Sequence, residues 1–295
     1  MQLIIFILVY PFIWFLSILP FRVLYTLSDI LCFLLFYVFK YRKKVISKNL
    51  KLAFPDKSSQ EISQLIKQHY CHFTDLMFET IKILSISEKS LNKRFIYKDI
   101  DVLNQLYAKN KSVLLVSGHY GNWEWLINME KFIKHKGHAV YKPLKNNYFN
   151  TFIRNLRSKF GATPVDKNHI IKKFIKNQRQ SILGIYLMVT DQSPKLTNTR
   201  YWASFLGIKV PVFVGSEVLA KKLDAAVVFL KVNKVKRGYY EASFKLLDKK
   251  TEKQNEYTIT NQFLEELEEQ IRAKPAYYFW THKRFKHAKV REVIY

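Results

Sequence analysis

From Ser112 onwards, short apolar runs alternate with helical segments, and this alternation limits the possible folds more than any other feature of the 295-residue chain. The apolar runs predict strands at residues 112–116, 138–142, 181–187 and 225–231. The segments between and after them predict helices at residues 122–134, 147–159, 168–178 and 212–223. Such alternation is typical of a mainly parallel sheet with helices on its faces. We therefore expect an α/β fold whose ligands bind beyond the carboxyl ends of the strands.

Helices are also predicted on both sides of this region. Residues 41–53 form a basic amphipathic pattern. A long helix is expected over residues 59–84, because Ser58 and Glu61 have the spacing of a capping box. After the alternating region, residues 239–247 alternate with period two and predict a strand at a sheet edge, followed by a polar helix over residues 257–272.

The N-terminus carries two apolar stretches, residues 1–21 and 30–39, and the first has no charged side chain. A helix that spans a membrane needs about 20 apolar residues, which the first stretch only just supplies. It lacks the basic start and small-residue cleavage site of a signal peptide. A buried helical pair in a soluble core is the competing interpretation. Because Tyr10, Trp14, Tyr25 and Tyr37 suit anchoring at a membrane interface, we predict a helical membrane anchor over residues 1–40 and one further domain over residues 41–295.

The chain has a formal net charge of +26, from 49 Lys and Arg against 23 Asp and Glu, which implies a polyanionic partner. Basic residues at 40–44 directly follow the predicted anchor and would stay in the cytoplasm. There, anionic lipid attracts each surface Lys or Arg by about 1 kcal/mol. Cys32 and Cys71 have no CxxC spacing and are interpreted as buried, reduced thiols.

The segment SGHYGNWEW, residues 117–125, places a histidine, two glycines and an acid directly after a predicted strand. Gly118 and Gly121 let the backbone turn tightly and let a substrate approach it closely. Asn122 can cap the helix that follows, whose free N–H groups favour an anion or a developing oxyanion. We therefore expect the substrate to bind close to Gly121 and Asn122.

His119 is the candidate general base, because an imidazole changes its charge near neutral pH. Glu124, five residues later, could hold one ring nitrogen and leave the other to accept a proton. The chain has no GxSxG motif, so the substrate would supply the nucleophile, most simply as a hydroxyl. The competing interpretation is a structural histidine in a strand–turn–helix corner. Neither a metal nor a cofactor is predicted, because the spacing is not that of an H-E-x-x-H zinc motif.

SGHYGNWEW resembles the H-x4-D/E signature of the glycerolipid acyltransferase superfamily, in the GHxGNWE form of the bacterial late lipid A acyltransferases. The likeness extends over nearly the whole chain and includes the segments YRKKVISKNLKLAFPDKSSQE, YKPLKNNYFNTFIRNLRSKFG, TDQSP, FLGIKV and YYFWTHKRFK. One loop departs from the family form, because SPKLTNTRYWAS lacks the compact glycine-containing run that is expected there. This departure concerns the identity of the acceptor more than the chemistry.

The resemblance implies that a fatty acyl chain moves from an acyl-carrier-protein thioester to a hydroxyl of a lipid A precursor. It implies a protein of the bacterial inner membrane with its catalytic domain on the cytoplasmic face. His119 would be the general base and Glu124 its orienting acid. Acyl carrier protein, a lipid acceptor and an anionic membrane surface are the expected partners.

Four further residues acquire an interpretation from the resemblance. Arg157 occupies the family's arginine position and would bind an anionic group or the polarised carbonyl, with Arg154 one turn earlier as its rival. Asp191 is a family position for which the sequence gives no role beyond substrate binding. His282 competes as a base, although it lies in a basic, aromatic run that is more typical of packing or membrane-facing surface.

Three other functions are compatible with parts of this pattern. An acyltransferase could use another glycolipid or an aminolipid as its acceptor. A lipid hydrolase would use water in place of the acceptor. A membrane-tethered nucleic-acid-binding protein would explain the charge, but it would leave the His/Glu pair unused, and no RNP, helix-turn-helix or zinc pattern appears in the chain. Nucleic acid is therefore not an expected partner.

Overall fold

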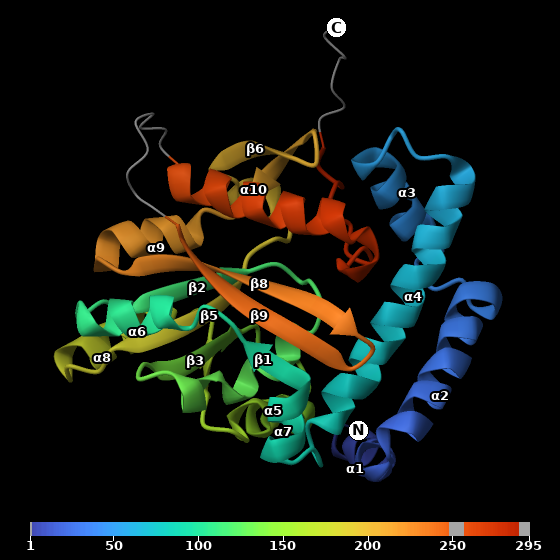
Figure 1. Cartoon of the computed structure of the whole chain (residues 1–295), viewed down its shortest axis with the longest axis horizontal. Coiled ribbons are helices and arrows are strands. Elements are labelled where there is room, and N and C mark those ends of the chain that lie inside the picture. The colour runs from blue at the N-terminus through green and yellow to red at the C-terminus, as the bar shows by residue number, and fades with distance from the viewer. Residues whose placement is uncertain (1, 248–256, 289–295) are drawn as a thin grey trace, which may run out of the picture.

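A computed structural model describes residues 2–247 and 257–288 of the chain. Its main feature is a seven-stranded sheet with the strand order β1-β9-β8-β2-β5-β3-β4, flanked by helices (Figure 1). The strands of this sheet are β1 (Phe95–Tyr97), β2 (Val113–Ser117), β3 (Lys136–Tyr141), β4 (Thr163–Asp166), β5 (Gly184–Val189), β8 (Ala226–Lys236) and β9 (Tyr239–Leu247). Only the β8–β9 pair is antiparallel within the described sheet. The expected mainly parallel α/β fold is confirmed.

Both faces of this sheet carry a hydrophobic core. Strand β2 lies near the centre, and its residues alternate between the faces, as the period of a strand requires. Leu114 and Val116 pack into the core that includes α8 (Ile170–Arg179) and α10 (Thr258–Ala273). Val113 and Leu115 pack into the core that includes α6 (Asp101–Ala108) and α7 (Asn147–Ser158). A strand buried on both faces reads as a continuous apolar run, which is why it was recognisable in the sequence.

The remaining helices include α1 (Gln2–Ile18), α2 (Phe21–Phe33), a π-helix (Leu34–Val38), α3 (Lys43–Ala53), α4 (Ser59–Lys82), α5 (Glu88–Arg94) and α9 (Gly215–Leu223). Most of the predicted helices are confirmed to within a few residues, and the Ser58–Glu61 capping box begins α4 as expected. One prediction was wrong in type. Residues 122–134 form a 3-10 helix, Trp123–Phe132, in which Trp125 to Met129 are buried in succession. This segment is packed on several sides and lacks the single apolar face of an amphipathic α-helix, so its surroundings determine its conformation.

The sequence also failed to predict three structural features. Strands β1 and β4 are only three and four residues long. Strands β6 (Tyr201–Phe205) and β7 (Ile208–Val212) form a separate antiparallel hairpin. The helix predicted from residue 212 therefore starts later, at Gly215, because residue 212 still belongs to β7.

Helix α4 runs along the end of the sheet at which the parallel strands finish (Figure 1). Its buried Glu79 joins this helix to three other parts of the chain. The carboxylate accepts hydrogen bonds from Tyr25 of α2 at 2.9 Å, from Asn122 at 2.7 Å and from Tyr240 of β9 at 2.8 Å. Burial raises the pKa of Glu79 to about 7, against the lowering effect of the nearby Lys234 charge. A single side chain thus connects the N-terminal helices, the sheet and the loop after β2.

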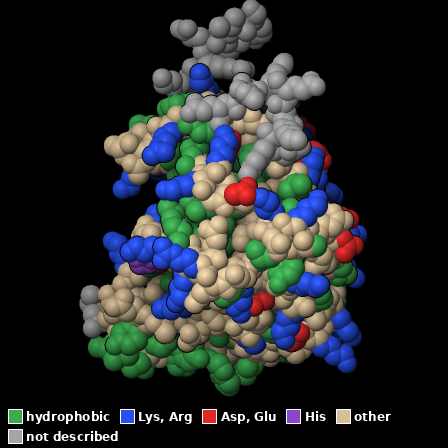
Figure 2. Space-filling model, turned by 90° about the vertical axis from the view of Figure 1, so that its left-hand side faces the viewer, with side chains coloured by type: hydrophobic (Ala, Val, Ile, Leu, Met, Phe, Trp, Pro, Cys, Tyr) green, Lys and Arg blue, Asp and Glu red, His purple; other side chains and the backbone are tan. Residues whose placement is uncertain are grey.

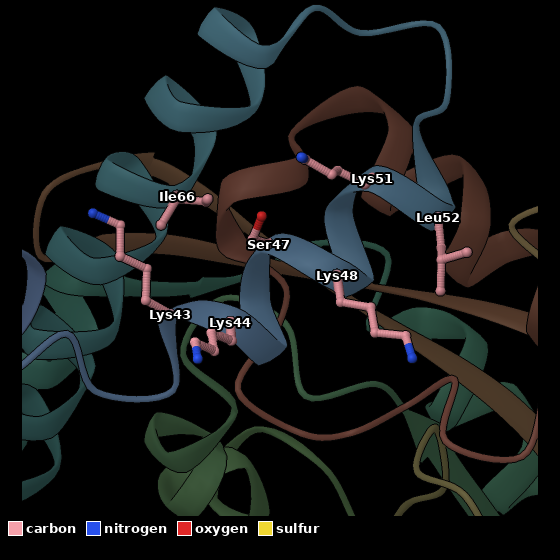
Figure 3. A pocket seen from close by; sticks show the side chains of 7 residues that line it. All are labelled: Lys43, Lys44, Ser47, Lys48, Lys51, Leu52 and Ile66. Carbon is pink, nitrogen blue, oxygen red and sulfur yellow. The ribbon is translucent and has the colours of Figure 1, made fainter.

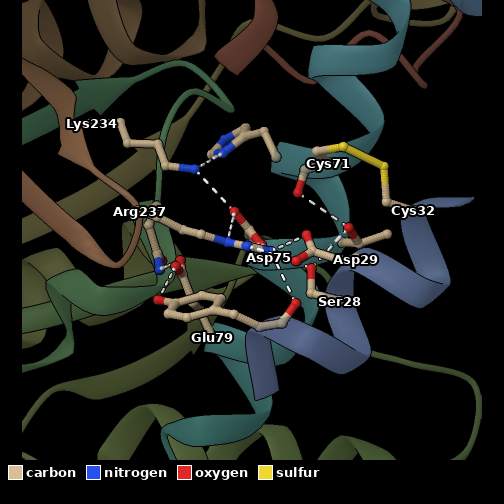
Figure 4. Close-up of polar contacts among 12 residues, drawn as sticks. Ser28, Asp29, Cys32, Cys71, Asp75, Glu79, Lys234 and Arg237 are labelled. Carbon is tan, nitrogen blue, oxygen red and sulfur yellow. Dashed lines mark hydrogen bonds and ion pairs between the residues drawn. A yellow bond between two sulfur atoms is a disulfide. The ribbon is translucent and has the colours of Figure 1, made fainter. Parts of the chain in front are cut away.

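One turn away, Asp75 forms a second polar link between the same elements (Figure 4). It accepts a hydrogen bond from Ser28 of α2 at 2.8 Å and pairs with Lys234 and Arg237 of the β8–β9 hairpin. Arg237 also pairs with Asp29 of α2 at 2.6 Å. Because Asp75 and Lys234 are almost fully buried, this pairing fixes the position of α2 against the hairpin.

The two cysteines are not the free thiols that the sequence suggested. Cys32 of α2 and Cys71 of α4 form a disulfide, with their Cα atoms 5.1 Å apart (Figure 4). They are 39 residues apart in the sequence, and only the packing of α2 on α4 brings them together. The interpretation of reduced thiols was therefore wrong, and the cysteines give no support to a reducing compartment.

The N-terminal helices carry a large exposed apolar surface. Residues Phe21–Val38 are the one stretch in the described chain long and apolar enough to cross a membrane, and 22% of that window is buried. Helix α1 is apolar but shorter, and most of its side chains are exposed, including Leu8 at 71% and Phe12 at 62%. Its inner side packs on α7, where Phe6 contacts Phe149. The ends of the predicted anchor and domain, residue 1 and residues 289–295, lie outside the described residues.

We expect the Glu79→Ala variant to lower the melting temperature strongly. The substitution leaves two buried donors, Asn122 and Tyr240, and the partly buried Tyr25 without their acceptor, and each buried donor costs about 1–3 kcal/mol. Glu61→Ala is the matched control, since Glu61 lies on the same helix but its carboxylate is half-exposed. Thermal unfolding in detergent, followed by circular dichroism, measures both. Equal shifts for the two variants would contradict the role assigned to Glu79.

Candidate active site

The loop after β2 is shaped by two glycines that have no room for a side chain. A Cβ at Gly118 would lie 2.5 Å from the Leu267 side chain. Gly121 has φ +62°, and a Cβ there would lie 3.0 Å from a methyl group of Val232. The loop is also bound to the C-terminal segment, because Gly121 N–H donates to the Tyr277 carbonyl and Phe279 N–H donates to the His119 carbonyl. His119 is therefore held at the carboxyl end of a central strand.

Asp191 is the carboxylate that contacts His119. Its Oδ1 lies 2.6 Å from His119 Nδ1, and its side chain is 2% exposed. Asp191 follows β5, the parallel neighbour of β2, and the Thr190 N–H donates to the Ser117 carbonyl where the two strands end. This places an acid from one strand beside a base from the next. The His119 side chain remains 21% exposed and can be reached from outside.

Burial alone would lower the pKa of His119, but the charge and hydrogen bond of Asp191, together with the charge of Glu124, outweigh it and raise the pKa above its usual value. For Asp191, burial acts to raise the pKa, but its contacts with His119 hold the pKa below the usual value. The pair thus favours an ionised carboxylate that stabilises a protonated imidazole. This is the electrostatic setting of a general base.

Glu124 lies near His119 but pairs with Arg157. Its two carboxylate oxygens lie 2.7 Å from an Nη and 3.2 Å from Nε of Arg157, a bidentate arrangement. The Trp123 indole N–H also donates to Glu124. Both partners are partly exposed, at 16% and 23%. The structure thus brings together all the expected charged residues of the site, but the acid on Nδ1 is Asp191 rather than Glu124. Arg154, the rival of Arg157, is exposed on α7.

Asn122 is fully buried and supports the loop from behind. Its side-chain oxygen accepts from the Trp125 N–H and caps the 3-10 helix, as the sequence predicted. Its amide nitrogen donates to Glu79. Gly121 lies beside it with its N–H bonded to Tyr277. Neither residue presents a free polar side chain to a ligand, so both shape the loop that carries His119.

Sequence reasoning missed Gln192. Its side-chain amide nitrogen lies 3.4 Å from His119 Nε2, the ring nitrogen opposite Asp191. The signal was present in the TDQSP segment, where Gln192 directly follows Asp191. If Nδ1–H donates to Asp191, Nε2 carries the lone pair, and Gln192 marks the position from which a proton would reach it.

The C-terminal segment completes the surroundings of Asp191. Tyr278 hydrogen-bonds to Asp191 and to the buried Arg284. An Nη of Arg284 donates to Ser193 Oγ at 3.1 Å. His282, the competing base, accepts from the Ser193 N–H through Nε2 at 3.4 Å, and burial lowers its pKa to about 4. All three C-terminal side chains therefore contact the loop that carries Asp191. Among the described residues, no group of three His, Cys, Asp or Glu side chains could hold a metal ion.

A family model of the bacterial lipid A biosynthesis acyltransferases matches residues 1–287. The chain belongs to this family. It is similar to a lipid A biosynthesis acyltransferase of Haemophilus influenzae, with 23% identity over 96% of this chain and 88% of the relative. It is also similar to two Escherichia coli K12 proteins. Identity to the lipid A biosynthesis lauroyltransferase is 21%, over 93% of this chain and 89% of the relative. Identity to the lipid A biosynthesis myristoyltransferase is 21%, over 83% and 75%.

The resemblance found in the sequence is thus confirmed, and this lipid A biosynthesis family member is an acyltransferase. The structure also shows where the chain departs from the family form near Asp191. The run SPKLTNTRYWAS leaves the His119–Asp191 contact and continues through a short 3-10 helix, Leu196–Asn198, into β6. The difference from the expected family form therefore lies in the connection between Asp191 and β6.

We expect Asp191→Asn to move the acid limb of the pH–rate profile to lower pH. A base at His119 must be neutral, so the rate rises as pH increases through the His119 pKa. The Asp191 charge raises that pKa, and removing the charge lowers it. Turnover should also fall, by up to about 10⁴-fold, as when the acid of a catalytic triad is replaced by its amide.

Glu124→Gln is the matched variant. The pH dependence of kcat/KM for acyl transfer separates the two carboxylates, and Glu124→Gln should shift the limb less, because Glu124 influences His119 by charge without a hydrogen bond. If Glu124→Gln moved the limb and Asp191→Asn left it in place, Glu124 would be the orienting acid, as the sequence first suggested.

Proposed function

We propose that this acyltransferase moves a fatty acyl group from an acyl-carrier-protein thioester to a hydroxyl of a lipid A precursor, with His119 as the general base. The observation that carries the proposal is the His119–Asp191 contact through Nδ1, which leaves Nε2 without a carboxylate partner and 3.4 Å from the Gln192 amide nitrogen. The acceptor hydroxyl would give its proton to Nε2 in the position that Gln192 now approaches. Its oxygen would attack the thioester carbonyl, the C–S bond would break, and the imidazolium would return the proton to the leaving thiolate.

The Glu124–Arg157 pair is proposed to act on the acyl group. Both carboxylate oxygens of Glu124 are directed to Arg157, which orients the guanidinium beside His119. A cation in that place can stabilise negative charge that develops on the carbonyl oxygen. The sequence assigned Glu124 to the histidine, and the geometry favours a positioning role for it towards Arg157. Gly121 and Asn122 are proposed to hold the loop in shape, so that substrate lies against it.

The membrane location is proposed from the exposed apolar surface of α1 and α2. Hydrophobic side chains gather at the lower edge of the face shown in Figure 2, the end of the molecule where α1 and α7 lie in Figure 1, whereas Lys and Arg are spread over the rest of that face. An exposed apolar surface of this kind marks a membrane or partner contact. The basic residues that follow α2 favour the cytoplasmic face of the bacterial inner membrane. Helices α1 and α2 pack on α4, so the proposed anchor is fixed to the catalytic domain.

In a reconstituted assay with acyl carrier protein as donor and a lipid A precursor as acceptor, the wild type should form an ester product. His119→Ala should retain its fold and lower turnover by about 10²–10⁴-fold, the usual contribution of general-base catalysis. Mass spectrometry of the lipid product and of total lipids from cells with and without the gene provides the measurement.

Two outcomes would reject this proposal. Release of free fatty acid at the same rate without acceptor would indicate a hydrolase. Near-wild-type turnover in a folded His119→Ala protein would exclude His119 as the base. An ester or amide formed only on another glycolipid or an aminolipid would leave the chemistry in place and change the acceptor.

A basic surface beside the site is proposed to attract the acidic carrier protein. Lys142 and Lys145 are exposed on the loop between β3 and α7. Lys159, which the sequence grouped with them, is engaged elsewhere, because its ammonium donates to the carbonyls that follow α4. Steering by charge affects encounter more than the chemical step. We therefore expect the two loop lysines to affect donor capture.

Reversing Lys142 and Lys145 to Glu should raise the KM for the protein-bound donor and change kcat little. A small neutral thioester, which needs no steering, is the control donor and should be used almost as well as by the wild type. Steady-state kinetics in detergent, where no anionic bilayer is present, measures both. Equal losses with both donors would refute the steering role of these lysines.

A further inference from the structure

Helix α3 presents a strip of lysines without acidic neighbours. Basic residues recur from Lys40 to Lys51, and no Asp or Glu occurs in that stretch. Lys44, Lys48 and Lys51 are exposed, and no carboxylate among the described residues forms an ion pair with them. Elsewhere on the surface many lysines are paired, as Lys131 is with Glu88. The α3 lysines repel one another, so an anionic ligand would stabilise them.

These lysines line an open groove of about 610 Å³ where α3 meets α4 (Figure 3). The lining residues are Lys43, Lys44, Ser47, Lys48, Lys51, Leu52 and Ile66. Lys43, Ser47 and Lys51 follow one another at intervals of four residues and lie on one row of the helix, as Lys44, Lys48 and Leu52 do on the next. The groove therefore combines ammonium groups and a hydroxyl with two aliphatic side chains. This lining matches a phosphate attached to hydrocarbon.

The groove begins just after the proposed anchor ends in the chain, since α3 starts at Lys43. The residues just before α3 are apolar and exposed, with Val38 at 56%, Phe39 at 66% and Tyr41 at 45%. Lys43 places its ammonium 3.9 Å from the ring centroid of Phe36. A cationic groove directly after an apolar surface is at the level of lipid headgroups when that surface is in a bilayer.

The opposite side of α3 is fastened to the C-terminal segment of the active site. Asn49 is buried and donates to the carbonyls of Trp280 and His282, at 2.9 and 2.7 Å. Arg42 donates to the carbonyl of Thr281. A ligand in the groove would thus be held by a helix that is rigidly joined to the segment around Asp191.

We propose that this groove binds the phosphate headgroup of an anionic phospholipid of the bilayer, with Lys44, Lys48 and Lys51 on the phosphate oxygens and Leu52 and Ile66 against the first part of the acyl chains. The biological ligand rests on the membrane association proposed above. A docked carrier protein fits less well, because a standard protein interface buries about 800 Å² per partner over 20–30 residues. The groove has seven lining residues and mixes charge with aliphatic surface.

The test measures binding of dihexanoyl phosphatidate to the full-length protein in a nonionic detergent by isothermal titration calorimetry. The triple variant Lys44→Gln, Lys48→Gln and Lys51→Gln should bind roughly a hundredfold more weakly, about fivefold for each lysine. The control variant is Lys172→Gln with Lys176→Gln, which removes exposed lysines from α8 at the other side of the molecule (Figure 1). It should bind as the wild type does. Unchanged thermal unfolding verifies that both variants are folded.

Further titrations with other ligands identify the chemical group that the groove recognises. Dihexanoyl phosphatidylcholine and inorganic phosphate should both bind much more weakly than dihexanoyl phosphatidate, because one lacks net charge and the other lacks hydrocarbon. The proposal is overturned if the triple variant binds phosphatidate like the wild type or if inorganic phosphate binds as tightly. It is also overturned if the triple variant changes only the KM for acyl carrier protein. His119→Ala should bind phosphatidate normally, which separates failure of the groove from failure of the proposed reaction.

Discussion

The rest of the structure depends on one buried carboxylate, Glu79, which must find hydrogen-bond donors in an apolar core. Tyr25, Asn122 and Tyr240 supply them from α2, from the loop after β2 and from β9. An unpaired buried acid is costly, so only the arrangement in which all three donors converge is favourable. A polar contact of this kind adds little net stability but selects one relative placement of the elements. The loop that carries His119 is positioned by this arrangement, because its Asn122 donates to Glu79.

Much of the fold was predictable, because the features that define it are local. Buried parallel strands read as apolar runs, and a capping box such as Ser58–Glu61 is recognisable over four residues. The short strands β1 and β4 carry too little pattern of their own, and their pairing is fixed by neighbours far away in sequence. The 3-10 helix after Asn122 was mistaken for an α-helix, because a segment buried on several sides has no single apolar face.

The site was predictable only as far as its residues are neighbours in the chain. His119 stood out through its glycines and its place after a strand, and Glu124 through its closeness to it. Asp191 is 72 residues away and reaches Nδ1 only because β5 lies beside β2 in the sheet. Cys32 and Cys71 show the same limit, since helix packing pairs them and no local spacing does. Family likeness marked Asp191 as a position, and the strand order explains its contact.

The loop that carries His119 is attached to the C-terminal segment, and this affects when the site can form during synthesis of the chain. Tyr278 pairs with Tyr120, Phe279 holds the His119 backbone, and Arg284 binds the loop that carries Asp191. During synthesis, the apolar N-terminal helices and all strands of the sheet are therefore made before the C-terminal residues that hold the His119 and Asp191 loops in place. If the proposed membrane contact forms while the chain is still growing, it precedes assembly of the site, because an unfinished chain lacks the C-terminal residues that hold His119 and Asp191 in place.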